Sequence, residues 1–221
     1  MRASVISTLI VSFVAGSTLL GSDQKQADEP SGRAVIREMN LARQNPAAYA
    51  TYLQESRSRI SGNVLVLPGG TRYRTKEGTR AIDEAIRFLQ TAQPLPALTL
   101  SPGMSRAAAD HCADQAGGGF GHAGRDGSHA DTRISRYGTL LGGWAENVSY
   151  GKSSARDVVL ALIIDDGLPG RKHRKNIFNP NYNFAGAAFG RHARFGTMCS
   201  MDFAGGYAER GATDTLVARN F

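Results

Sequence analysis

The chain has 221 residues and a mass of 23.6 kDa, a length typical of one domain with a terminal extension rather than of two domains. It carries 26 Lys and Arg against 19 Asp and Glu, a formal net charge of +7, and 41% of its residues are hydrophobic, which excludes a disordered chain. Its two cysteines exclude a disulfide-dense scaffold and a four-thiolate zinc site.

The N-terminal segment has the pattern of an export signal. Arg2 precedes an uncharged, largely apolar stretch over residues 3–20, and the small residues Ala15, Gly16 and Ser17 offer a cleavage context. A transmembrane anchor is the alternative, but Ser, Thr and Gly dilute the stretch, which is short for a span. The sequence therefore predicts a signal peptide at 1–22, a polar linker at 23–30 and a domain at 31–221, located outside the cell or in the periplasm.

Export affects how the two cysteines are interpreted. Cys112 and Cys199 are an even pair, and in an oxidising compartment such a pair predicts one disulfide. The alternative is two buried free thiols, because cysteine packs well as a small hydrophobe.

Helical periodicity or capping marks three parts of the first half of the chain. Apolar residues from Arg33 onward predict a helix that is interrupted at Asn45-Pro46 and resumes to Leu53. A second apolar stripe covers residues 81–89. Ser101-Pro102 is a strong helix start, and the three glycines at 117–119 end that helix.

The last part of the chain combines a helix with a hairpin. Ser153 or Ser154 caps a helix to about Asp166, although the apolar run at 158–164 also fits a buried strand. Residues 184–190 and 197–204 have the pattern of a β-hairpin. Helices followed by a closing hairpin predict an α+β fold, with helices packed on a small antiparallel sheet.

Two common motifs carry no function here. Residues 119–124 match G-x-G-x-x-G by letter, but they follow a helix rather than a strand, so a dinucleotide site is not predicted. The basic run at 171–175 contains no interleaved aromatic residue. We interpret the run as a solvated loop and expect no nucleic-acid partner.

Polar residues gather in four segments between glycine-rich turns, at 120–127, 145–151, 158–167 and 173–177. Two further segments, 39–46 and 201–204, lie before and after them. In this order, the segments resemble those of the CAP superfamily (cysteine-rich secretory proteins, antigen 5 and pathogenesis-related proteins, also called SCP), in particular its bacterial secreted branch. The resemblance covers about residues 33–207, and it leaves residues 56–80 unmatched as an insertion. It implies an α–β–α sandwich with a cleft lined by two histidines and two acidic residues.

Carried over residue by residue, the resemblance implies a cleft formed by His122, Glu146, His173 and an acid at the end of the 154–166 helix. Asp165 fits that register best, and Asp166 is the alternative. Many relatives have Glu at this position, so the shorter Asp is a departure that reaches less far into a cleft.

These residue types are suited to two kinds of chemistry. His122, His173 and Glu146 could hold Zn²⁺ or another divalent cation with an open position for water. Without metal, a glutamate beside a histidine can move a proton near neutral pH.

The remaining histidines have simpler interpretations. His111 lies on an apolar helical stripe and is expected in the core, whereas His129 and His192 are expected to be solvated loop residues. Several basic residues are expected to form a rim around the histidine cleft: Arg125, Arg171, Lys172, Arg174 and Lys175.

The leading functional hypothesis is a secreted, monomeric protein that binds a lipid, a cell-envelope ligand or a divalent metal in this cleft, with no reaction implied. The alternative is a metal-dependent hydrolase in which Glu146 is the general base for a metal-bound water. A third possibility is a structural extracellular module.

Overall fold

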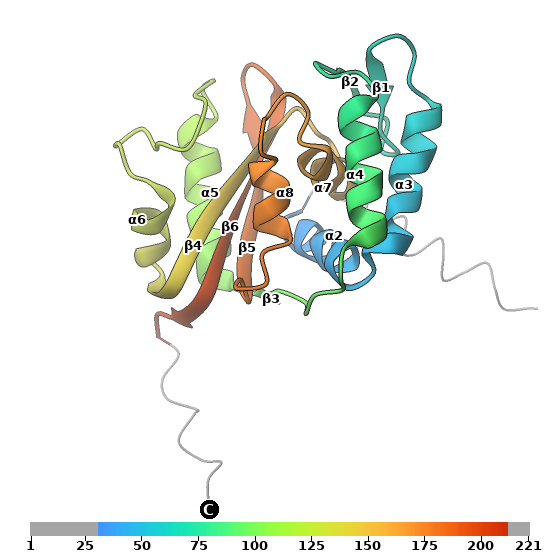
Figure 1. The fold of residues 1–221 in the computed structure, drawn as a ribbon. Coiled ribbons are helices and arrows are strands. Elements are labelled where there is room, and N and C mark those ends of the chain that lie inside the picture. Colours follow the sequence, from blue (N-terminus) through green and yellow to red (C-terminus); the bar gives the residue numbers. More distant parts are fainter. Residues whose placement is uncertain (1–30, 212–221) are drawn as a thin grey trace, which may run out of the picture.

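A four-stranded sheet separates two helical layers in the computed structural model, which describes residues 31–211 (Figure 1). The strand order is β3-β5-β6-β4; β3 runs parallel to β5 and the other neighbours are antiparallel. The arrangement confirms the predicted α–β–α sandwich. The strands are β3 (Thr99–Leu100), β4 (Gly138–Tyr150), β5 (Phe184–His192) and β6 (Gly196–Glu209).

Helices cover both faces of the sheet (Figure 1). One face carries α5 (Pro102–Gln115) and α6 (Ala130–Ser135). The other face carries the remaining helices, which are α2 (Gly32–Gln44), α3 (Pro46–Ser58), α4 (Arg80–Thr91), α7 (Ala155–Ile164) and α8 (Lys172–Ile177).

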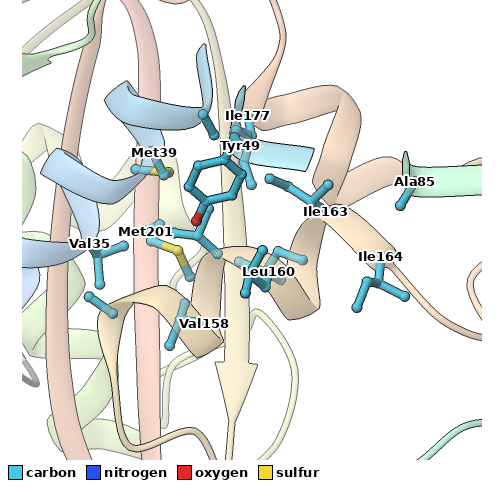
Figure 2. Close-up of a cluster of buried hydrophobic side chains, with 14 of the residues drawn as sticks. Val35, Met39, Tyr49, Ala85, Val158, Leu160, Ile163, Ile164, Ile177 and Met201 are labelled. Carbon is cyan, nitrogen blue, oxygen red and sulfur yellow. The ribbon is translucent and has the colours of Figure 1, made fainter. Parts of the chain in front are cut away.

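The larger core lies on the α2 and α7 face (Figure 2). Val35 and Met39 of α2 meet Val158 of α7 and Met201 of β6 there, and all four are fully buried. Because side chains alternate along a strand, Ala204 of β6 instead joins a smaller core with α5 and α6. The sheet is therefore buried on both faces.

The predicted helix starts are confirmed. Ser101 and Ser154 each accept a hydrogen bond from a backbone N–H three residues ahead, which satisfies a donor that the helix itself leaves unpaired. Residues 158–164 are helical, so the competing strand interpretation is wrong. The break at Asn45-Pro46 and the hairpin of β5 and β6 are also observed.

Strand β4 was not predicted. It is one of the two edge strands of the sheet, and its first half contains Gly142-Gly143 and an irregular register between Leu141 and Trp144. Exposed and interrupted, this half lacks the regular apolar alternation by which strands are recognised. Its second half, from Ala145 to Tyr150, is regular and carries the functional segment.

The unmatched segment at 56–80 forms a short hairpin of β1 (Val64–Val66) and β2 (Arg72–Arg74). Two carboxylates of the α7 region hold it in place. Asp157 accepts hydrogen bonds from the backbone N–H groups of Gly69 and Thr71. Asp166 accepts from those of Lys76 and Glu77. The insertion is thereby fixed beside the start and the end of α7.

The predicted disulfide between Cys112 and Cys199 is wrong, because both are free, buried thiols. Cys112 belongs to α5 and packs with Val148 and Met198 on one face of the sheet. Cys199 follows Met198 on β6, so its side chain points to the opposite face and joins the larger core. Burial raises the pKa of Cys112 to about 11 and that of Cys199 well above its ordinary value.

The basic run at 171–175 is not a solvated loop. It forms α8 and its N-cap, and Arg174 is buried. Arg171 binds Glu77 and Glu84, and Arg174 also binds Glu84. The run therefore fixes α8 against α4.

The predicted signal peptide at 1–22 and linker at 23–30 lie outside the described residues. Within residues 31–211, no helix has both the length and the apolar content needed to cross a bilayer.

Candidate functional site

The four predicted cleft residues form two histidine–carboxylate pairs. His122 Nδ1 lies 2.7 Å from Glu146 Oε1, and His173 Nδ1 lies 2.7 Å from Asp165 Oδ1. An ionised carboxylate only accepts hydrogen bonds, so Nδ1 is the donor in each pair. The carboxylates are buried, whereas 54% of the His122 side chain and 20% of the His173 side chain are exposed.

Glu146 is held by residues distant in the sequence. Its Oε2 accepts hydrogen bonds from Arg133 Nη2 at 2.6 Å and from Ser200 Oγ at 3.2 Å. The Arg133 side chain is fully buried, so the two charges neutralise each other away from water. Burial alone would raise the pKa of Glu146, but hydrogen bonding to His122 and the charges of His111 and Arg133 lower it overall.

Asp165 is held by local geometry instead. It ends α7 in the left-handed region, with φ 54° and ψ 42°, which aspartate tolerates better than most residues. From there its Oδ2 accepts the backbone N–H of His173 at 2.9 Å, while Oδ1 takes the ring. The shorter side chain therefore does reach its histidine. Asp166 instead accepts the backbone N–H groups of Lys76 and Glu77, next to the β1–β2 hairpin.

Strand β4 connects the two pairs. Glu146 and Asn147 are consecutive, so they point to opposite sides of the strand. Glu146 binds His122, and Asn147 Nδ2 donates to the His173 carbonyl at 3.1 Å. Asn147 Oδ1 also accepts from Asn176 of α8 at 2.7 Å. This edge strand thus fixes the position of both histidines.

Both histidines line one cavity of about 490 Å³. Its wall is largely apolar, and apart from the two histidines and Tyr150, Lys172 is the one ionisable side chain among the residues that line it. Phe120, which is 72% exposed, stacks on Tyr150 with ring centroids 4.8 Å apart. The lining residues are Phe120, Gly121, His122, Val148, Tyr150, Leu168, Pro169, Lys172 and His173.

The predicted metal set of His122, His173 and Glu146 does not fit this geometry. Within residues 31–211, no group of three or more His, Cys, Asp or Glu side chains is arranged to hold a metal ion. The reason is chemical, because both oxygens of Glu146 already accept hydrogen bonds. A carboxylate bound to the Nδ1 of a histidine orients that ring rather than serving as a ligand itself.

The predicted basic rim is only partly correct. Lys172 lines the histidine cavity, but Arg171, Arg174 and Lys175 line a separate hollow beside α4. Arg125 lines a third hollow, next to residues 114–124.

For the other three histidines, the predicted burial is confirmed at two positions and wrong at one. His111 is buried as predicted, with Nε2 3.0 Å from the Gly121 carbonyl and 3.9 Å from Glu146 Oε2. His129 is exposed as predicted. His192 was expected to be solvated, but it is buried, and its Nε2 lies 2.7 Å from the Gly119 carbonyl. It therefore braces the glycine-rich loop that carries Phe120.

Sequence reasoning missed three residues of the site: Arg133, Asn147 and Asp202. Their place in the site follows from how α6, β4 and β6 pack against one another, which the local sequence does not show. Asp202 is paired with Glu146 in the β4–β6 register and is fully buried. Neither of its oxygens has a hydrogen-bond partner. Burial, reinforced by the charge of Glu146, raises the pKa of Asp202 well above its ordinary value.

Comparisons with solved structures give only partial matches to this chain. An extracellular SCP-domain protein from Bacillus anthracis is 18% identical, with a TM-score of 0.40, and the match covers 50% of this chain and 34% of that one. An outer surface protein from Borrelia burgdorferi is 17% identical, with a TM-score of 0.41, and the match covers 50% of this chain and 78% of that one. A cysteine-rich secretory protein from Staphylococcus aureus is 14% identical, with a TM-score of 0.38, and the match covers 63% of this chain and 44% of that one. The match thus spans about a third of the Bacillus protein.

Comparison with curated protein sequences gives no match. The model of the cysteine-rich secretory protein family, CAP, matches residues 37–203, which is most of the chain and includes both histidine–carboxylate pairs. The chain therefore belongs to the cysteine-rich secretory protein family.

Proposed function

We propose that this CAP-domain chain is exported and binds, in the cavity between His122 and His173, a small ligand with an apolar body and a hydrogen-bonding group. Export is supported by the signal-like pattern of residues 1–22. Ligand binding is supported above all by one observation. The two imidazoles are oriented by buried carboxylates, and both line an apolar cavity of the size that small-molecule sites have.

The orientation of the rings defines the polar group. Each Nδ1–H is used by a carboxylate, and no residue of the described chain hydrogen-bonds to either Nε2. While the ring is neutral, Nε2 accepts a hydrogen bond, so a ligand hydroxyl or amide N–H is the matching donor. Two such acceptors beside Phe120, Val148 and Leu168 suit an amphiphile rather than a fully polar molecule.

The structure does not favour the hydrolase alternative. That mechanism requires Glu146 to bind or deprotonate a metal-bound water, but Glu146 is buried and accepts hydrogen bonds from Arg133, Ser200 and His122. Its lowered pKa also makes it a weak base. We therefore propose binding without an associated reaction.

Calorimetric titration of the full chain with monomeric decanol tests the proposal. We expect binding to wild type and a loss of about fivefold or more in His122→Ala, because one hydrogen bond is worth about 1 kcal/mol. His129→Ala is the matched control, since His129 is exposed and does not line the cavity. The absence of binding to wild type, or equal affinity in both variants, would contradict the proposal.

A further inference from the structure

The histidine cavity opens into a second hollow, of about 360 Å³, beside the β1–β2 hairpin. Five residues line both spaces, so they form one continuous groove. The shared residues are Phe120, Val148, Tyr150, Leu168 and His173. The groove therefore has a largely apolar middle that also contains His173, with His122 at one end and the hairpin at the other.

The hairpin end differs in charge from the middle. Arg74, Lys76 and Lys152 line it, and within residues 31–211 no ion pair joins any of them to a carboxylate. Arg74 and Lys76 are exposed. Arg74 Nη1 donates to the Asn63 side-chain oxygen, and Lys152 Nζ donates to the Tyr150 carbonyl at 3.1 Å.

Two acids also line this end, but their oxygens are already used. Asp165 accepts the ring and backbone N–H of His173. Asp166 accepts the backbone N–H groups of Lys76 and Glu77. In the part of the chain that the structure describes, neither acid forms an ion pair with the three cations, so the cations remain available to an incoming negative charge.

Tyr73 adds a buried polar atom beside this end of the groove. Tyr73 lies between Arg72 and Arg74 on β2 and lines the same hollow. Its Oη is buried and has no hydrogen-bond partner. The Lys152 ammonium lies 5.2 Å from the centre of the Tyr73 ring, so a cation and an unpaired donor occur together.

We propose that the hairpin forms an acid-binding subsite of the groove, and that the ligand is an anionic amphiphile. Its acidic group lies against Arg74, Lys76 and Lys152, and its apolar chain lies on Phe120, Val148 and Leu168. The chain passes His173, and its far end reaches His122. This inference rests on the proposed function, because it defines the ligand of the same cavity.

Calorimetry with three soluble probes tests the subsite on the full chain. Decanol carries only a hydroxyl, decanoate only an acid, and ω-hydroxydecanoate carries both, one at each end. We expect ω-hydroxydecanoate to bind about tenfold more tightly than decanol, as charge-assisted hydrogen bonds at a partly exposed site allow. This advantage should shrink in high salt.

Hairpin variants assign the effect to the subsite. The double variant Arg74→Gln/Lys76→Gln should lose most of the tenfold advantage, because Lys152 alone remains of the three cations. Arg72→Gln removes one positive charge from the strand that carries Arg74, but Arg72 does not line the groove, so this control should keep the tenfold advantage. Because both changed side chains are exposed, folding of the double variant can be verified by its unchanged thermal unfolding.

The outcomes separate the two proposals. Equal binding of decanol and ω-hydroxydecanoate would overturn the subsite and leave the proposed function intact. An advantage that persists in the double variant would also overturn it, because the acid would then bind elsewhere. Binding to anionic phosphatidylglycerol vesicles without binding of the soluble acids would overturn it in favour of a membrane surface. If no probe binds, the proposed function fails as well.

Discussion

The two histidine–carboxylate pairs have the same geometry but are built in different ways. Glu146 is fixed by tertiary contacts with Arg133 and Ser200, which come from α6 and β6. Asp165 is fixed by a turn, since its partner His173 is only eight residues away and its own backbone is left-handed. The first pair should therefore depend on the packing of the whole sheet, and the second on the junction of α7 and α8.

The largest effect is expected from Arg133→Met, which leaves Glu146 buried without its cation. Removing one partner of a buried ion pair costs about 3–5 kcal/mol, so the free energy of unfolding in urea should fall by that amount. Arg136→Met is the matched control. Its ion pairs with Asp110 and Asp126 are partly exposed, so the loss should stay below about 1 kcal/mol. Similar losses in both variants would mean that Glu146 is not held as described.

Asp202 should make the first pair sensitive to pH. Its pKa is raised in the folded state, so above about pH 4 the unfolded chain releases a proton that the folded chain keeps. Stability should therefore fall as pH rises, by up to about 1.4 kcal/mol per pH unit from this residue, until the folded pKa is passed. Glu146 acts in the opposite sense, since its lowered pKa adds stability that is lost only as pH falls below about 4.5.

Asp202→Asn should remove the fall in stability that rising pH causes through Asp202. Chemical unfolding measured between pH 5 and pH 8 should give a flatter stability profile than wild type. An unchanged profile would show that Asp202 is ionised in the folded protein, in contact with water or a cation.

The second pair should respond more weakly and more locally. Asp165→Ala removes the acceptor for the His173 N–H and ring, and losses of this kind typically cost about 1–2 kcal/mol. Asp166→Ala is a close control, because Asp166 also accepts two N–H groups but faces the hairpin. Nitrogen chemical shifts of the His173 ring should change in the first variant and remain in the second. A change in both would show that the hairpin and α8 move together.

The smallest effect is expected for Glu146→Gln on the zinc content of the protein. Because the carboxylates orient the histidines instead of completing a ligand set, dialysed protein should retain substoichiometric zinc, equally in wild type and Glu146→Gln. One equivalent of zinc in wild type that is lost in Glu146→Gln would restore the three-ligand centre.

The contrast also explains what the sequence could predict. Periodicity and caps predicted α5 and α7 because these are local properties of Ser101-Pro102 and Ser154. The resemblance placed His122, Glu146, Asp165 and His173 in one cleft, and the structure brings them together in pairs. Burial of Arg133, the unpaired state of Asp202 and the orientation of Glu146 depend on contacts between distant segments, which neither spacing nor composition encodes.

The disulfide prediction failed for the same physical reason. Strand alternation shows that Met198 and Cys199 point to opposite faces of the sheet, but it does not show which face α5 covers. That choice is tertiary, and it places Cys112 with Met198.

The separation of the two cysteines makes each of them a reporter of a different half of the molecule. Cys112 can meet an alkylating reagent only when the α5 layer opens, and Cys199 only when the layer of α2 and α7 opens. Mass spectrometry of timed alkylation would give an opening rate for each layer from the same sample. Because no disulfide links the two layers within residues 31–211, the chain can also reach its native packing under reducing conditions.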